Sequence, residues 1–171
     1  MEINVYDNFL PHDQFLRIQE LMLSPSFVWF FADNIDYHDE PLQGKFQFVH
    51  PFYGYKGVES HNFVDMAPLL DKLDCRYLLR GKANLNVRGD RNAIGQFHTD
   101  VNIDAVTKTA VFYINTNNGG TEFENGDIVR SIENRVVIFD SKIKHRGISC
   151  TNEKRRVLLN WNWIPATETN Y

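Results

Sequence analysis

From Tyr77 to the C-terminus the sequence is a succession of short strand-like segments separated by turns, and this pattern constrains the fold more than any other feature. The turns are rich in Gly, Asn and Asp, which tight connections between antiparallel strands favour. Short strands at this spacing are typical of a β-sandwich or a jelly roll. The predicted strands are residues 83–88, 95–100, 107–115, 121–123, 127–131, 135–139, 145–149 and 156–164.

The N-terminal part of the chain has a different pattern. Residues 3–10 predict an extended segment, and residues 13–23 predict a helix with one apolar face. Residues 65–74 predict a second helix, in which Pro68 falls in the first turn, where proline is tolerated. The aromatic stretch 29–61 between the helices predicts core and loop packing, and a lid over a substrate site is the alternative.

We therefore expect a single domain over residues 1–171, mainly β with supporting α-helices. Residues 1–76 would form a helical and aromatic support region, and residues 77–171 would form a double-stranded β-helix, which is the jelly roll of cupin-like proteins.

Charge and composition exclude several classes of partner. A net charge of -4 argues against nucleic acid, because phosphate binding depends on clustered Lys and Arg. The longest apolar run, around residues 27–32, is far shorter than the roughly 20 residues that cross a bilayer. Since no secretory leader opens the chain, Cys75 and Cys150 are expected to be reduced thiols in a cytoplasmic protein. The number of subunits stays open.

His98 and Asp100 lie two positions apart in a predicted strand. Side chains two apart in an extended strand point to the same side, so these two can bind one ion between them. A single H-x-D pair is a weak signal, since a lone histidine is more often structural. His38 with Glu40 has a similar spacing, but it lies in a loop-like stretch that would not hold its geometry.

His145 follows after a tyrosine-bearing strand, a Gly-Gly turn and an aliphatic strand. Antiparallel strands bring distant segments together, so His145 can meet His98 and Asp100. Two imidazoles and one carboxylate on one face of an octahedron leave the opposite positions open, which is the arrangement of Fe(II) centres that activate oxygen. These three residues are the predicted metal ligands.

Five segments resemble one family when they are taken together. They are GQFHTD at 95–100, TAVFYIN at 109–115, GGTEF at 119–123, RVVIFDSKIKHRG at 135–147 and RVLLNWNW at 156–163. In this order they are similar to the iron(II)- and 2-oxoglutarate-dependent dioxygenases, in particular the compact prolyl-hydroxylase-like branch. The resemblance runs from Leu79 to the end of the chain, and the N-terminal helices match only as general support.

The resemblance implies an enzyme that binds Fe(II) at His98, Asp100 and His145 and uses 2-oxoglutarate and O2 as cosubstrates, with ascorbate in support. It also implies that a basic residue on the last strand holds the distal carboxylate of 2-oxoglutarate. Tyr113 resembles the family tyrosine whose hydroxyl reaches that carboxylate, and a core tyrosine with a bonded hydroxyl is the alternative.

Either Arg155 or Arg156 can be that basic residue. Alternation favours Arg156, because Leu158, Asn160 and Asn162 then also point inward, while the tryptophans at 161 and 163 point toward the helices. The opposite phase would place the two amides against the helical layer, where they lack partners. The family spacing from arginine to tryptophan favours Arg155 instead.

The substrate is less constrained by the sequence. One interpretation places four polar residues along a substrate channel, and the other places them on an exposed sheet face: Asn84, Asn86, Arg88 and Gln96. If Arg156 points inward, Asn160 and Asn162 also belong to the substrate site. The first hypothesis is a hydroxylase of a peptidyl residue, proline by resemblance. The second is a hydroxylase of a small metabolite or free amino acid. The third is a non-catalytic jelly-roll binding protein, which a missing iron ligand would have favoured.

Overall fold

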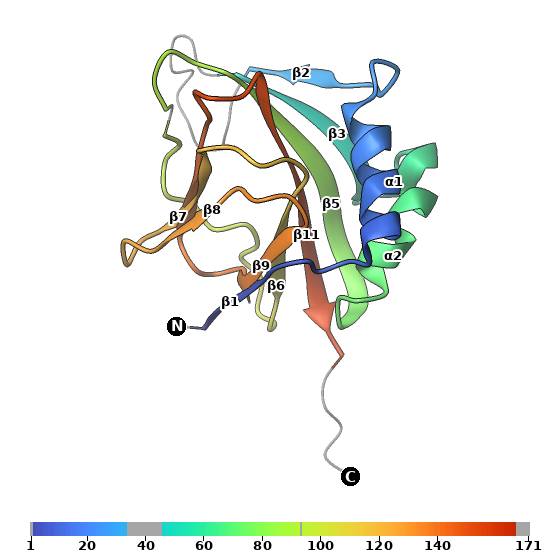
Figure 1. Ribbon diagram of the computed structural model, residues 1–171. Helices are drawn as coiled ribbons and strands as arrows, with labels where there is room; N and C mark the ends of the chain where they lie inside the picture. The colour runs from blue at the N-terminus through green and yellow to red at the C-terminus, as the bar shows by residue number, and fades with distance from the viewer. Residues whose placement is uncertain (1, 34–45, 93, 167–171) are drawn as a thin grey trace.

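The computed structural model describes residues 2–33, 46–92 and 94–166, and its two antiparallel sheets face each other (Figure 1). The larger sheet has the strand order β1-β9-β6-β11-β5-β3-β2, with β4 beside β3, and the smaller sheet has the order β10-β7-β8. The larger sheet contains β1 (Ile3–Tyr6), β2 (Phe30–Ala32), β3 (Gln47–Gly54), β4 (Gly57–Val58), β5 (Cys75–Val87), β6 (Lys108–Tyr113), β9 (Arg135–Asp140) and β11 (Arg155–Pro165). The smaller sheet contains β7 (Gly120–Phe123), β8 (Ile128–Arg130) and β10 (His145–Ile148).

The predicted class, a mainly β jelly roll with supporting helices, is confirmed by this arrangement. The boundary expected after residue 76 falls inside β5, and the N-terminal strands β1, β2 and β3 belong to the same sheet as β6, β9 and β11. The N-terminal region thus supplies strands as well as helices, with β1 and β2 at the two ends of the larger sheet.

The helices cover the outer face of the larger sheet (Figure 1). Helix α1 (His12–Leu23) buries Phe15, Ile18 and Met22 there. The helix predicted over residues 65–74 lies earlier in the chain and has two parts: a 3-10 helix (His61–Met66) and then α2 (Ala67–Leu70). The Ser60 hydroxyl accepts a hydrogen bond from the Asn62 amide. This cap allows the 3-10 helix to begin earlier than the apolar pattern indicated.

Strand β11 separates the apolar core from the interior of the jelly roll. Val157, Leu159, Trp161 and Trp163 belong to the core under the helices. A Cβ atom on Gly81, which is opposite Trp161 on β5, would overlap the indole ring, so the close packing of this strand pair requires glycine there.

The segment 95–100, which was predicted to be a strand, is not one. The chain from Ile94 to His98 meets β10 at two isolated bridges, Ile94 with Ile148 and His98 with His145, and the Gly95 amide donates to the Gly147 carbonyl at 3.0 Å. The His98 and His145 backbones exchange two hydrogen bonds of 3.0 Å, and the Asp100 amide donates to the Ser141 carbonyl at 3.1 Å. Because β10 has only four residues, its pairing with this segment is discontinuous. The few backbone hydrogen bonds nevertheless hold the segment in place.

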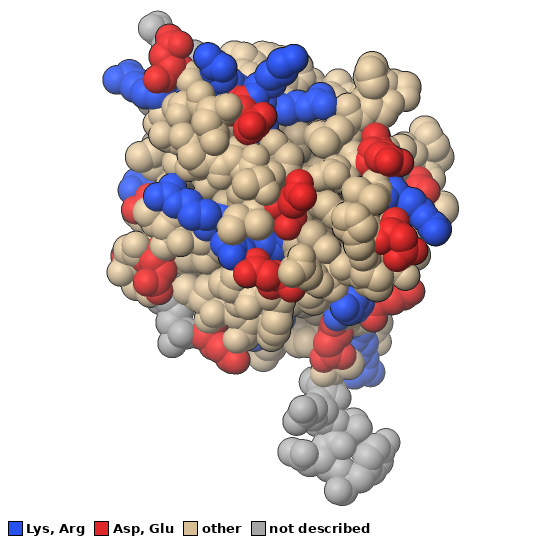
Figure 2. Space-filling view, in the orientation of Figure 1, with Lys and Arg blue, Asp and Glu red and all other residues tan. Residues whose placement is uncertain are grey.

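Two further observations describe the surface. Positive and negative side chains are mixed over the face in Figure 2. Within the described ranges, no helix has the length and apolar character to cross a membrane.

Candidate metal centre

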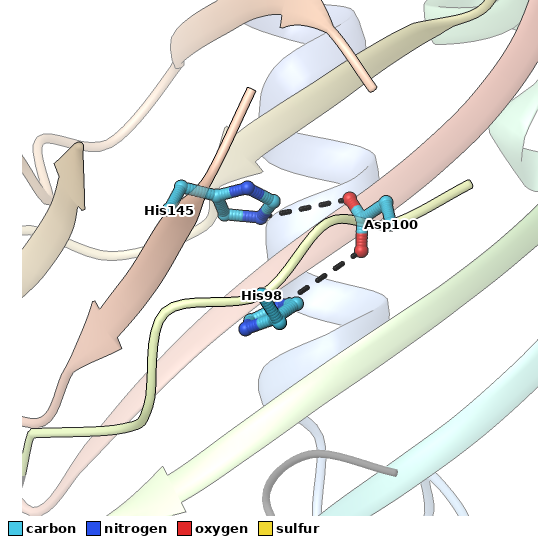
Figure 3. Close-up of side chains that lie close together, drawn as sticks. All are labelled: His98, Asp100 and His145. Atoms are coloured by element: carbon cyan, nitrogen blue, oxygen red, sulfur yellow. Dashed lines mark ion pairs between the residues drawn. The ribbon is translucent and has the colours of Figure 1, made fainter. Parts of the chain in front are cut away.

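His98, Asp100 and His145 meet at one point inside the jelly roll (Figure 3). Their ligand atoms all lie within 4.8 Å of one another. His145 Nε2 is 3.6 Å from Asp100 Oδ2, and His98 Nε2 is 4.0 Å from Asp100 Oδ1. The direct pairing of His98 with His145 brings the imidazoles together, and the two-residue spacing puts Asp100 on the same side as His98.

The hydrogen bonds of the two imidazoles select the nitrogen that faces the centre. The Nδ1 of His145 is 3.0 Å from the Ile143 carbonyl, and the Nδ1 of His98 is 3.1 Å from the Gln96 carbonyl. A carbonyl only accepts, so each Nδ1 carries the proton and each Nε2 presents its lone pair. Metal-bound histidines are oriented in this way. Two such nitrogens and one carboxylate fit a divalent iron.

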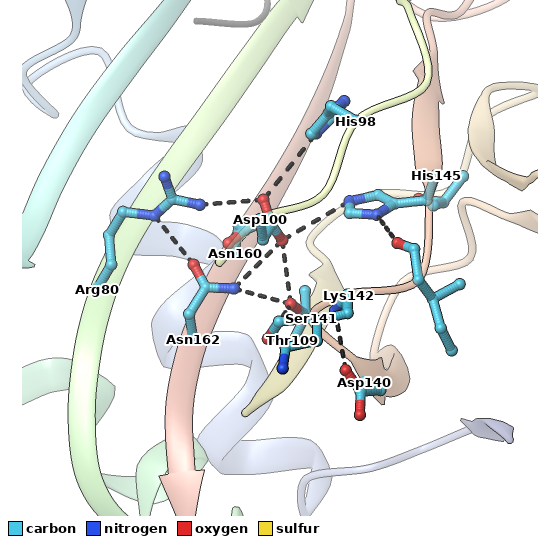
Figure 4. A network of polar contacts seen from close by, with 12 residues as sticks. Arg80, His98, Asp100, Thr109, Asp140, Ser141, Lys142, His145, Asn160 and Asn162 are labelled. Carbon is cyan, nitrogen blue, oxygen red and sulfur yellow. Dashed lines mark hydrogen bonds and ion pairs between the residues drawn. The ribbon is translucent and has the colours of Figure 1, made fainter. Parts of the chain in front are cut away.

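The Asp100 carboxylate is held by donors from three strands (Figure 4). Its Oδ2 accepts hydrogen bonds from Asn160, Asn162 and Thr109 at 3.0, 3.2 and 3.1 Å, and its Oδ1 accepts one from Arg80 at 3.0 Å. Burial alone would raise the pKa of this carboxyl, but His145, Arg80 and the Asn160 hydrogen bond hold it well below its ordinary value. Asp100 is therefore ionised and fixed in position.

The same pocket contains Arg156. Its guanidinium is buried, donates to the Asn86 side chain at 3.2 Å and to the Gly120 carbonyl at 2.9 Å, and lies over the Tyr113 ring. Its Nε is a buried donor without a hydrogen-bond partner in the described part of the chain, so an acceptor from a ligand would satisfy it. The pocket is lined by Gln47, Lys82, Asn84, Asn86, His98, Asp100, Val111, Thr121, His145, Gly147, Arg156, Leu158 and Asn160.

Arg155 points the other way, as the alternation of β11 indicated. Its guanidinium donates to the Leu23 carbonyl at the end of α1 at 2.7 Å. The structure therefore places Arg156, and not Arg155, in the pocket with the three candidate ligands.

Comparisons with known proteins give matches in structure only. No protein-family model matches the sequence, and no curated protein matches it. A prolyl hydroxylase from Trichoplax adhaerens, solved with a hypoxia inducible factor peptide fragment, aligns over 94% of this chain and 83% of its own, with a TM-score of 0.65 and 14% identity.

Two further structures extend the likeness. An oxidoreductase of the 2OG-Fe(II) oxygenase family from Burkholderia pseudomallei aligns over 94% of this chain and 84% of its own, with a TM-score of 0.63 and 10% identity. HygX from Streptomyces hygroscopicus, solved with nickel and 2-oxoglutarate, aligns over 99% and 85%, with a TM-score of 0.56 and 10% identity. This chain has the fold of the 2-oxoglutarate- and iron(II)-dependent oxygenases. The fold expected from the sequence resemblance is thereby confirmed.

Within this oxygenase fold, Tyr113 lies behind the pocket. Its hydroxyl is 2.8 Å from Thr121 Oγ1 and 3.3 Å from the Val129 carbonyl, and the side chain is fully buried. Burial raises the pKa of Tyr113, so the hydroxyl keeps its proton and donates it. Thr121, which does line the pocket, can then direct its own hydroxyl proton toward a ligand.

The residues considered for substrate binding divide into three groups. Asn84, Asn86 and Asn160 line the pocket. Asn162 is fully buried and holds the Asp100 carboxylate from behind. Arg88 and Gln96 are exposed, and neither lines the pocket. His38 and Glu40, the other metal candidate, lie outside the described residues.

Sequence reasoning missed several residues of the site. Arg80 and Lys82 share the inward face of β5 with Asn84 and Asn86, and the strand was expected to begin only at residue 83. A β5 of full length would have shown the run of inward polar residues. Gln47 on β3 hydrogen-bonds Asn84 at 2.7 Å, and the sequence carries no comparable signal for it.

Proposed function

We propose that this protein is an Fe(II)- and 2-oxoglutarate-dependent oxygenase that hydroxylates its substrate. The observation that carries the proposal is the presence, in one pocket, of the two histidines and one aspartate together with the buried guanidinium of Arg156. A metal site alone fits many proteins, but a metal site facing a buried arginine suits a ligand that chelates at one end and is anionic at the other.

His98, Asp100 and His145 would hold the iron, and Arg156 would bind the distal carboxylate of 2-oxoglutarate. Arg156 and Asn160 are four residues apart on β11, which corresponds to about 13 Å along an extended strand. The long arginine side chain and a five-carbon dicarboxylate together suit such a separation. Burial lowers the pKa of the Arg156 guanidinium, and a carboxylate partner would compensate the cost of burying its charge.

Thr121 would add a second hydrogen bond to that carboxylate, with Tyr113 orienting the threonine hydroxyl from behind. Tyr113 would thus support cosubstrate binding indirectly, whereas the resemblance implies direct contact. Arg155 would have no part in binding 2-oxoglutarate, because it bonds to the end of α1.

When it is bound, the iron supplies the oxidation: 2-oxoglutarate, O2 and a substrate C–H bond become succinate, CO2 and a C–OH group. The chain contributes the positions of the reactants. Four donors keep Asp100 in place, and the carbonyl partners of the imidazoles keep both Nε2 atoms directed at the centre.

The substrate would approach over Gln47, Lys82 and Asn84, on the side of the pocket formed by β3 and β5. Amides and an ammonium group favour a partner with its own polar groups, because they can exchange hydrogen bonds with it. A peptide, with proline as the residue suggested by resemblance, and a small metabolite or free amino acid are both of this kind. Ascorbate would serve as a supporting reductant in either case.

The decisive experiment measures succinate formation from 2-oxoglutarate with Fe(II), ascorbate and O2, and screens proline-containing peptides and free amino acids for a mass gain of one oxygen atom. Asp100→Ala should abolish turnover. It removes little apolar burial but leaves four donors without their acceptor, so the fold of the variant is checked by circular dichroism. The matched control is Asp104→Ala, an exposed aspartate in the same loop. A wild-type protein that binds Mn(II) and 2-oxoglutarate but forms no succinate with any candidate would favour the non-catalytic binding protein.

A further inference from the structure

Arg80 brings a second guanidinium to the candidate metal centre. It lies on β5 directly opposite Asn162 of β11. Its Nη2 donates to Asp100 Oδ1 at 3.0 Å, and its Nε donates to Asn162 Oδ1 at 2.9 Å (Figure 4). The Asn162 amide cannot be turned around, because its nitrogen must face the acceptor-only carboxylate of Asp100. The guanidinium is therefore held in one orientation by two acceptors.

The two carboxylate oxygens of Asp100 accept different numbers of hydrogen bonds. Oδ2 accepts three donors, from Asn160, Asn162 and Thr109, which more than fills its two lone pairs. Among the described residues, Arg80 is the one hydrogen-bond donor that reaches Oδ1, so this oxygen keeps the capacity for another bond. A metal ion would accordingly bind through Oδ1 and share that oxygen with a guanidinium.

This sharing changes the charge of the site. The side chain of Asp100 is 5% exposed and that of Arg80 is 26% exposed, so solvent screens the pair only partly. Arg80 neutralises the one anionic ligand, and a divalent ion there keeps its full double charge. The pocket also contains the cations Lys82 and Arg156, and the charge of Arg80 adds to theirs. This added charge favours the 2-oxoglutarate dianion and disfavours a divalent ion that binds alone.

We propose that Arg80 is a charge-balancing residue, which weakens the binding of the divalent ion alone and strengthens the binding of 2-oxoglutarate to the metal-loaded protein. The inference rests on the proposed function, since it assumes that both ligands bind here. It assigns to Arg80 a role that favours the complete metal and cosubstrate complex over the protein with metal alone.

The test compares wild type with Arg80→Gln by calorimetry, first titrating Mn(II) and then titrating 2-oxoglutarate into the Mn(II)-saturated protein. Removing the cation should tighten Mn(II) binding about 3-fold to 10-fold and weaken 2-oxoglutarate binding by a similar factor, as expected for one unit charge at a partly screened site. The two constants must move in opposite directions. If Arg80 served only to position Asp100, both ligands would bind more weakly, and that result would overturn the proposal.

Matched variants separate charge from shape. Arg80→Lys keeps the cation and should leave both constants within about twofold of wild type, while Arg80→Met should repeat the opposite shifts if the glutamine variant folds poorly. Arg146→Gln removes another arginine, one residue from His145, that pairs with Glu122 at 2.8 Å and stacks on Phe97; it should change neither constant more than about twofold. A wild type that binds neither Mn(II) nor 2-oxoglutarate would instead overturn the proposed function.

Discussion

The outer and inner faces of the larger sheet differ most clearly on β11, where they alternate residue by residue. The outer face carries Val157, Leu159 and two tryptophans, all buried under the helices. The inner face carries Arg156, Leu158, Asn160 and Asn162, and its polar members contact the pocket or the Asp100 carboxylate.

This difference separates stability from chemistry within a single strand. Apolar side chains on the outer face gain free energy by leaving water, in proportion to the area they bury. Polar side chains on the inner face gain little from burial and must satisfy one another or a ligand. A substitution on one face should therefore change the free energy of unfolding, and a substitution on the other should change ligand binding.

The largest expected effect is on the outer face. Trp161 is fully buried and stacks on Phe52 at a centroid distance of 5.8 Å. Trp161→Ala should lower the free energy of unfolding by about 3 to 5 kcal/mol, because it leaves a large cavity beside Gly81. Urea denaturation followed by circular dichroism measures it. A loss below about 1 kcal/mol would contradict the assignment of this face to stability.

The next effect is on the inner face. Arg156→Ala removes the charge-assisted pair proposed for the distal carboxylate, so 2-oxoglutarate should bind about 30-fold to 1000-fold more weakly, or roughly 2 to 4 kcal/mol. Calorimetry with Mn(II) present gives the dissociation constant, and circular dichroism checks the fold. Unchanged 2-oxoglutarate binding in this variant would break the division between the faces.

A smaller effect concerns pH and the outer face. His50 is buried against Phe27 and Phe52, its Nδ1 is 2.7 Å from the Val28 carbonyl, and its Nε2 is 2.8 Å from the Ser60 hydroxyl. Burial lowers the pKa of His50 below its ordinary value. As the pH falls, the His50 side chain is protonated in the unfolded chain before it is protonated in the folded chain. Its contribution to the free energy of unfolding is therefore complete above about pH 6.5 and is lost as the pH falls toward the pKa of the folded state.

The slope from this one group is at most about 1.4 kcal/mol per pH unit. Urea denaturation between pH 5 and pH 8 measures the slope, and His50→Gln should flatten it. His12→Gln, which changes an exposed histidine at the start of α1, is the control and should leave the slope as in wild type. Equal slopes in wild type and His50→Gln would mean that the histidine is not buried in its neutral form.

The smallest effect is expected for Arg155→Ala, one residue from Arg156. The variant loses a hydrogen bond to the last turn of α1, with a cost of about 1 kcal/mol in stability and no change in 2-oxoglutarate affinity. The same calorimetric and denaturation measurements compare it with Arg156→Ala. If Arg155→Ala weakened 2-oxoglutarate binding and Arg156→Ala did not, the two faces would be exchanged.

The sequence alone determined those features that depend on local alternation and order. The phase of β11, with Arg156 inward and Trp161 outward, follows from the period of two along any strand. The order of the motifs along the chain also selected His98, Asp100 and His145, although the segment that carries His98 and Asp100 is held by bridges and is not a regular strand. These expectations did not require the pairing partners to be known.

Only the tertiary structure decided which residues from other strands meet that pattern. Arg80 reaches Asp100 because β5 begins at Cys75 and pairs with β11 in one register, with an irregularity between Asn162 and Trp163. The Tyr113 hydroxyl on β6 donates a hydrogen bond to Thr121 on β7 because the two sheets face each other across the pocket. Register and sheet facing arise from many weak contacts summed over the whole core, and no short stretch of sequence contains that sum.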